Sequence, residues 1–204
     1  MFPSRLGQYK NRMSLEGIRM KKQLVLGCFA AFLFAGCAQE KPTKIEVKLY
    51  NAFGDKVGTA KVSQETSGVK ISIKAEGFTP GVHGVHIHEM GECKAPDFIS
   101  SGDHFNLDKK KKHGLLHPEG YENGDLPNVI ADGEGKIKAD LTAPQVSLKE
   151  GKTTLHKKDG ASLIITENAD DGMTQPAGNS GKRIVCGVIV KKASEIKKEK
   201  GKGK

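Results

Sequence analysis

KIEVKLY, residues Lys44–Tyr50, alternates polar and apolar side chains. VKISIKA (Val69–Ala75) and KIKADL (Lys136–Leu141) repeat this period of two, which is typical of antiparallel strands with one buried face. ASLIIT (Ala161–Thr166) and RIVCGVIV (Arg183–Val190) are more continuously apolar, which indicates better buried strands. Gly-Asp, Thr-Pro-Gly and Asp-Gly turns fall between the segments. The pattern predicts an all-β sandwich or barrel.

Two stretches of the expected domain have no strand pattern. They run from about Glu89 to Pro127 and from Glu167 to Lys182. Loops of this length in a compact domain are usually functional. The chain has no Trp, so the core of the domain must be built mainly from Val, Ile and Leu.

The N-terminal region has the organisation of a signal peptide over residues 20–36. A basic start at Met20–Lys22 precedes an apolar run, Leu24–Ala35, that is too short to span a bilayer. LFAGC then resembles a bacterial lipobox, in which Cys37 is lipidated and becomes the first mature residue. The alternative is ordinary secretion with cleavage near Ala38.

We therefore expect an exported protein that is lipid-anchored to the outer face of a bacterial cell membrane. Residues 1–19 lack signal-peptide character, which favours Met20 as the start of translation. Cys93 and Cys186 are the two cysteines left in the mature domain. Outside the cytoplasm such a pair usually forms a disulfide.

The net charge of +9 is unevenly distributed. The end of the chain, from Lys191, holds seven lysines and few apolar residues, so we expect residues 192–204 to be a disordered tail. The tail could be attracted to an anionic lipid surface or could only aid solubility. Nucleic acid is not an expected partner, because the chain is exported and does not interleave aromatic with basic residues.

Histidines are concentrated in one part of the chain. Six of the seven lie between His83 and His117, and GVHGVHIHEMGEC (residues 81–93) holds three of them. An extended run places His86 and His88 on the same face. Because imidazole is a good ligand for zinc and copper, the cluster predicts a metal site; a surface His-rich loop is the alternative.

Further motifs give this cluster a family resemblance. SSGDHFN, KKHGLLHPEG, GDLPN and GNSGKRIVCGVI follow the histidine run in order, and the chain resembles the Cu/Zn superoxide dismutase family over residues 42–191. The resemblance implies a Greek-key antiparallel β-barrel of about eight strands that acts on superoxide. It assigns roles to the following residues: copper ligands His86, His88 and His104; zinc ligands His104 (bridging both metals), His113 and Asp125; a supporting carboxylate, Asp170; a superoxide-guiding arginine, Arg183; and the disulfide Cys93–Cys186.

The chain departs from the family pattern at two ligand positions. Thr166 stands where the family has its fourth copper histidine, and a neutral hydroxyl is a poor substitute for imidazole. Glu122 stands where the family has its second zinc histidine, and a carboxylate can bind zinc; His117 could take the same place. We expect zinc binding, weaker copper binding and weak dismutase activity. A zinc-only family member and a copper-buffering envelope protein are the alternatives, and the oligomeric state stays open.

Overall fold

A computed structural model describes residues 43–194 of the chain, and these residues form one antiparallel sheet of nine strands. The predictions for residues 1–42, including the start site, the signal peptide and Cys37, lie outside the described residues, as does the tail from residue 195. The elements are β1 (Lys44–Asn51), β2 (Lys56–Glu65), β3 (Gly68–Ala75), β4 (Gly81–His83), β5 (Val85–His88), the 3₁₀ turn η2 (Ile99–Ser101), β6 (Val129–Ala131), β7 (Ile137–Ala143), β8 (Ala161–Thr166) and β9 (Arg183–Val190).

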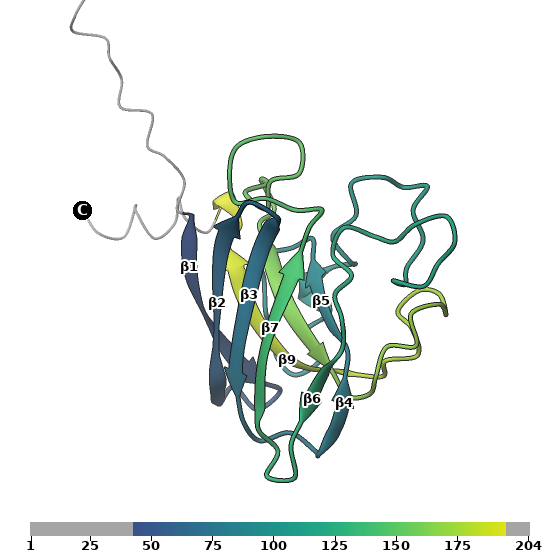
Figure 1. Ribbon diagram of the computed structural model, residues 1–204. Coiled ribbons are helices and arrows are strands. Elements are labelled where there is room, and N and C mark those ends of the chain that lie inside the picture. The colour runs from purple at the N-terminus through teal and green to yellow at the C-terminus, as the bar shows by residue number, and fades with distance from the viewer. Residues whose placement is uncertain (1–42, 195–204) are drawn as a thin grey trace, which may run out of the picture. The chain divides into compact units, whose positions relative to one another are not determined.

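The sheet curls into a nearly closed barrel (Figure 1). Its strand order is β4-β6-β7-β3-β2-β1-β9-β8-β5, so the two end strands, β4 and β5, are consecutive in the chain and separated only by Gly84. β3 pairs with β7 after an excursion through β4, β5 and β6, as in a Greek key. The all-β prediction is confirmed. The strand number exceeds the expected eight because Gly84 divides one run into two strands.

The core follows the period-two pattern of the sequence. In β1 the buried side chains are Val47 and Leu49, and their polar neighbours face solvent. β8 differs because all six of its residues are buried. Leu163 and Ile165 belong to the main core inside the barrel, whereas Ile164 packs on the outer face against Phe98 and Cys186. Each such aliphatic side chain contributes about 1.5–3 kcal/mol when fully buried.

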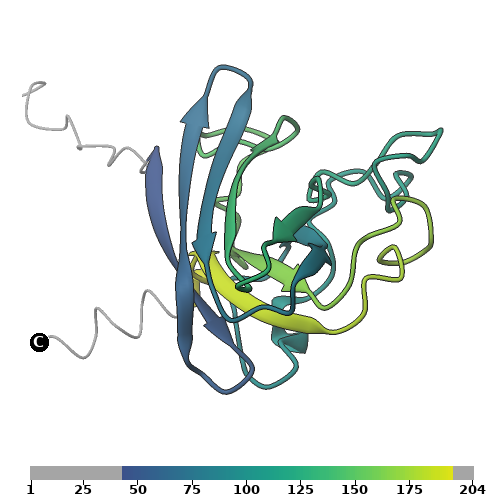
Figure 2. The ribbon, with the colours of Figure 1, turned by 60° about the horizontal axis from the view of Figure 1, so that its bottom comes forward.

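The two predicted functional loops lie on the same side of the barrel (Figures 1 and 2). The first runs from Glu89 to Asn128, and the second covers Glu167–Lys182. They contact each other, because Gln175 Nε2 donates a 2.8 Å hydrogen bond to the carbonyl oxygen of His113.

A third long connection, residues 144–160, was not singled out from the sequence and lies at one end of the barrel. It packs Val146, Leu148 and Leu155 into the core. Among residues 43–194, no helix has the length and apolar character needed to cross a membrane.

Candidate metal centre

Strand β5 presents its histidines on the outer face of the barrel. Val85 and Ile87 belong to the inner core, so the alternation of the strand turns His86 and His88 the other way. Both side chains are nevertheless buried, with exposed fractions of 0% and 1%. The first long loop therefore forms a second layer over this face.

This loop lies directly along β5. The N–H of Ile87 donates to the carbonyl of Gly124, and the N–H of Phe105 donates to the carbonyl of Ile87, both at 2.8 Å. His104 is thereby held opposite His88, and Asp125 opposite His86. A Cβ at Gly124 would lie 2.2 Å from the carbonyl oxygen of Ile87, so this close approach requires glycine.

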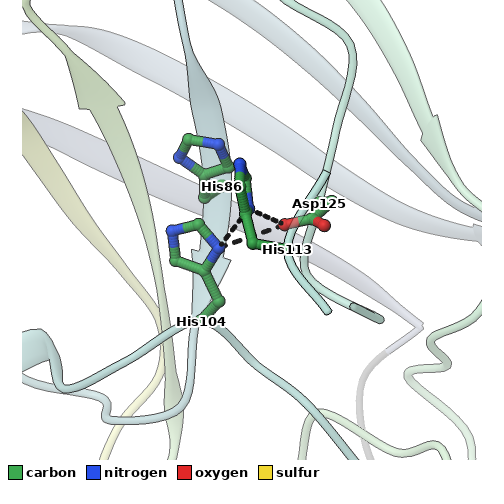
Figure 3. Close-up of side chains that lie close together, drawn as sticks. All are labelled: His86, His104, His113 and Asp125. Atoms are coloured by element: carbon green, nitrogen blue, oxygen red, sulfur yellow. Dashed lines mark hydrogen bonds and ion pairs between the residues drawn. The ribbon is translucent and has the colours of Figure 1, made fainter. Parts of the chain in front are cut away.

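Four donor atoms from the loop converge on one point, and Figure 3 shows the three that belong to His104, His113 and Asp125. His104 Nδ1 and His113 Nδ1 are 3.2 Å apart, and each lies 3.0 Å from Asp125 Oδ1. Glu122 Oε2 lies 3.1 Å from His104 Nδ1 and 3.9 Å from His113 Nδ1. Tetrahedral ligands bound at zinc–nitrogen or zinc–oxygen distances lie about 3.3 Å apart. The donor types and their spacing therefore fit a four-coordinate zinc ion.

Asp170 forms hydrogen bonds with both His86 and His113. Its Oδ2 accepts from His86 Nε2 at 2.8 Å, and its Oδ1 accepts from His113 Nε2 at 3.1 Å. Asn128 fixes Asp170 through two hydrogen bonds to its backbone, of 2.8 and 3.0 Å. Burial opposes ionisation of Asp170, but the hydrogen bonds from His113 and His86 outweigh it and hold the pKa of this carboxyl well below its usual range. A carboxylate in this position fixes both the tautomer and the ring orientation of its histidines.

The pKa of His113 responds to the same contacts. Burial disfavours its charged form, but hydrogen bonds with Asp125 and Asp170 raise the pKa to about 10. The pKa of His104 is also raised, because Asp125 and Glu122 outweigh its burial. The carboxylates of this cluster therefore favour the protonated form of both histidines.

A second donor set lies next to the first. His104 stacks on His86 with a ring-centroid distance of 4.2 Å, and its ring lies 4.9 Å from that of His88. His88 Nδ1 donates to the carbonyl of Gly102 at 2.9 Å, which leaves a lone pair on Nε2. Hydrogen bonding of His86 Nε2 to Asp170 likewise leaves a lone pair on Nδ1.

These two lone-pair nitrogens are buried, and within the described residues neither has a hydrogen-bond partner. Burial lowers the pKa of both His86 and His88, and the nearby charges of His104 and Arg183 lower that of His88 further. Neutral imidazoles with free lone pairs are what copper or zinc requires. The His86, His88 and His104 set therefore fits a three-histidine copper site.

Thr166 lies at the edge of this second set. It is on the same face of β8 as Ile164, which pairs with His86, and a Cβ built on Gly84 would contact both Thr166 Oγ1 and the His86 ring. The Thr166 hydroxyl donates to the carbonyl of Asn168 at 3.2 Å. The backbone oxygen of Thr166 lies 2.9 Å from His83 Nδ1, which indicates a structural role for His83.

Arg183 approaches the same site from β9. Its Nη1 donates to the carbonyl of Phe98 at 3.1 Å and to Ser101 Oγ at 2.8 Å. Ser101 Oγ in turn lies 3.4 Å from His88 Nδ1. The disulfide Cys93–Cys186 ties the start of the loop to β9. Burial lowers the pKa of Arg183, which still leaves a cation beside His88.

The structure therefore brings together most of the predicted site residues: His86, His88, His104, His113, Glu122, Asp125, Asp170 and Arg183. His117 is not in the cluster, and its Nδ1 accepts from the N–H of Glu119 at 3.3 Å. Two positioning residues were missed. Asn128 lies in GDLPN, where only Asp125 was predicted to have a role, and Ser101 lies in SSGDHFN, where only His104 was.

Comparisons with known proteins agree with this geometry. The family model described as copper/zinc superoxide dismutase (SODC) matches residues 56–189. A superoxide dismutase [Cu-Zn] 1 of Aquifex aeolicus is 44% identical over 164 residues, covering 79% of this chain and 95% of the relative. The superoxide dismutase-like protein YojM of Bacillus subtilis is 39% identical over 191 residues, covering 84% of this chain and 97% of the relative.

Solved structures give the same picture. A crystal structure of a SOD-like protein from Bacillus subtilis matches with a TM-score of 0.68 and 42% identity, covering 71% of this chain and 97% of the other. A double mutant of such a protein, in which a tyrosine and a proline are replaced by histidine, gives a TM-score of 0.69 at 43% identity, covering 72% of this chain and 99% of the other.

Proposed function

The chain belongs to the copper/zinc superoxide dismutase family, and from this premise we propose that it is an envelope lipoprotein that binds zinc firmly and copper weakly, with weak superoxide dismutase activity. The observation that carries the proposal is the pair of adjacent donor sets that share His104. One set has the spacing of a zinc site, and the other holds two buried lone-pair nitrogens, on His86 and His88.

The zinc role rests on the first set. His104, His113, Asp125 and Glu122 would hold the ion, and Asp170 would keep His113 oriented. All four ligands belong to the first long loop, so a bound zinc ion would hold separate segments of that loop together. Zinc would therefore stabilise the second layer over β5 as well as the site itself.

The dismutase role rests on the second set together with Arg183. Copper, when bound by His86, His88 and His104, supplies the one-electron oxidation and reduction that dismutation requires. The Arg183 guanidinium, fixed by Phe98 and Ser101, attracts the superoxide anion to the neighbourhood of His88. His104 Nε2 is the site atom suited to hold and return a proton.

Thr166 is the reason to expect weak activity. Its hydroxyl is bonded to a backbone carbonyl, and a neutral oxygen adds little to copper affinity. This observation also favours a second candidate function, a zinc-only family member without turnover.

Export and the lipid anchor are supported by two features. The apolar run before LFAGC places Cys37 where a lipobox cysteine belongs. The Cys93–Cys186 disulfide is of the kind that persists in oxidising compartments outside the cytoplasm. These features support our proposal that the protein acts on the outer face of a bacterial membrane, with superoxide as its partner from solution.

The test is metal loading of the domain that starts at Ala38, with bound metal and superoxide removal measured in parallel. We expect about one zinc per chain, copper that a chelator removes easily, and low turnover; His88→Ala should abolish copper binding and leave zinc bound. Zinc without any copper would establish the zinc-only alternative, and firm copper without turnover would establish the buffering role. Binding of neither metal would overturn the proposal.

A further inference from the structure

The two ends of the barrel differ in charge. Because the strands are antiparallel, the start of β1 lies beside the end of β2, with Lys44 opposite Ser63. The backbone oxygen of Thr43 accepts from the N–H of Gln64 at 2.8 Å, and Gln64 Oε1 accepts from the N–H of Leu148 at 2.7 Å. Gln64 thus places the N-terminal edge of the domain next to the connection 144–160.

The C-terminal edge of the domain meets the same connection. The N–H of Ala193 donates to the carbonyl of Lys158 at 2.9 Å. Figure 1 shows the start of β1, the connection 144–160 and the end of β9 at the same end of the barrel. We call this region, made of residues 43–44, 144–160 and 191–194, the tether end.

The tether end is rich in lysine. Its lysines are Lys44, Lys149, Lys152, Lys157, Lys158, Lys191 and Lys192, and its acidic neighbours are Glu65, Glu92, Glu150 and Asp159. Lys44, Lys149, Lys152, Lys158 and Lys191 are exposed. Five more lysines follow within residues 195–204, against two glutamates.

The opposite end of the barrel has no excess of lysine. The register places the turn between β1 and β2, the end of β3 and the start of β7 together there. The charged residues at this end are Asp55, Lys56, Lys74, Glu76, Asp132, Glu134, Lys136 and Lys138, all of them exposed. Four lysines thus stand against four acidic residues, and Lys136 is paired with Glu134. The domain therefore has a lysine-rich end and an end with balanced charge.

The lysine-rich end is also the end that the chain would attach to a membrane. Residue 43 follows Cys37 by only six positions, which limits the tether to about 22 Å even if fully extended. Such a short tether keeps the tether end close to the surface in which a lipid on Cys37 is inserted. An anionic surface attracts each nearby lysine and repels acidic groups.

We propose that the tether end is a docking surface for anionic phospholipid headgroups, which orients the barrel on its own membrane. The proposal rests on the lipid anchor of the proposed function. Docking at this end leaves the metal loops, which lie on the side of the barrel, open to solvent. Superoxide then reaches Arg183 without passing between the protein and a negatively charged surface that would repel it.

The test uses the domain from Ala38 to Ser194, which lacks the anchor and the last ten residues but contains the whole sheet and its core. Co-sedimentation is measured with vesicles of phosphatidylcholine alone and with added phosphatidylglycerol, at low and physiological salt. The triple variant Lys149→Gln, Lys152→Gln, Lys158→Gln is compared with an equally charged control, Lys109→Gln, Lys110→Gln, Lys112→Gln, whose lysines are exposed on the metal loop.

We expect binding to the phosphatidylglycerol vesicles alone, weakened by salt. The tether-end variant should lose about tenfold to 100-fold in partition coefficient, and the control should lose much less. Equal losses in both variants, or no binding by the parent domain, would overturn the proposal. Binding to a soluble polyanion but not to vesicles would also overturn it.

The anchor is tested separately, by mass spectrometry of Cys37 in the full chain and by membrane fractionation of Cys37→Ser. Unmodified Cys37 with intact vesicle binding would refute the lipid anchor and support the docking surface. Lipidated Cys37 without vesicle binding by the domain would support the anchor and refute the docking surface.

Discussion

Gly178→Ala should disable the metal centre from outside its ligand set. Gly178 has φ +62°, and a Cβ built on it would lie 1.8 Å from Asp170 Oδ1 and 2.9 Å from His113 Nε2. The backbone cannot withdraw easily, because the N–H of Gly178 donates to Thr174 at 2.7 Å and its carbonyl accepts from Asp171 at 2.9 Å. The added methyl group must therefore displace the Asp170 carboxylate from its histidines.

The size of the effect follows from two separate terms. An alanine in the left-handed region costs about 1–2 kcal/mol wherever it occurs. Displacing Asp170 breaks charge-assisted hydrogen bonds to His86 and His113, each contributing about 1.5–3 kcal/mol. Loss of a carboxylate that orients metal-binding histidines lowers metal affinity about 10-fold to 100-fold.

Gly77→Ala is the matched control. Gly77 has φ +87°, and no atom lies within 4 Å of the position of a Cβ. The Gly77→Ala variant therefore has the conformational cost of an alanine at positive φ but no steric clash. Zinc affinity is measured by chelator competition, and the melting temperature of the metal-free domain is measured alongside. We expect Gly178→Ala to bind zinc at least about tenfold more weakly than Gly77→Ala. Equal zinc affinities in the two variants would refute the assignment of Asp170 as the group that orients the ligands.

Three further outcomes are expected. Thr166→His should increase copper retention and superoxide turnover, measured by metal analysis and a superoxide assay, because the side chain at this position lies beside the His86 ring; no change in either would show that the missing histidine is not the limiting defect. Glu122→Gln should lower zinc affinity about tenfold or more, whereas Glu119→Gln, on an exposed residue of the same loop, should not; equal affinities would exclude Glu122 as a ligand. The pKa of His113 is raised to about 10 in the metal-free protein, so its proton stabilises the fold fully below pH 6.5 and this stabilisation is lost as the pH rises through 10. The same proton must leave when zinc binds, so zinc affinity should rise about 100-fold per displaced proton between pH 6 and pH 8. Calorimetry in two buffers that shows no proton release on zinc binding would contradict this.

The barrel could be predicted because its signal is local. Alternation in Lys44–Tyr50 and Val69–Ala75 is a property of each strand, and the structure places both in the sheet with their apolar faces inward. The connection 144–160 was missed for the same reason. Val146, Leu148 and Leu155 are buried but follow no strand period, so their contribution to the core depends on how the loop folds.

The site was predictable in its residue types and less so in its contacts. His86 and His88 share a face because they are two residues apart in a strand, which the sequence alone requires. Glu122 and His117 lie in a loop full of turns, where spacing does not determine direction, and only the folded loop separates the two. Ser101 contacts Arg183 across 82 positions, a relation that no single sequence displays.

The division of β5 and β8 between two faces has a consequence for how this protein could change over time. Val85, Ile87, Leu163 and Ile165 keep the barrel closed from inside, while the positions that carry the chemistry alternate with them on the outside. A substitution at residue 166 can therefore change metal binding without loosening the interior. The residues that close the barrel and the residues that face the site lie on opposite sides of the same strands. Either set can therefore change during evolution while the other is retained.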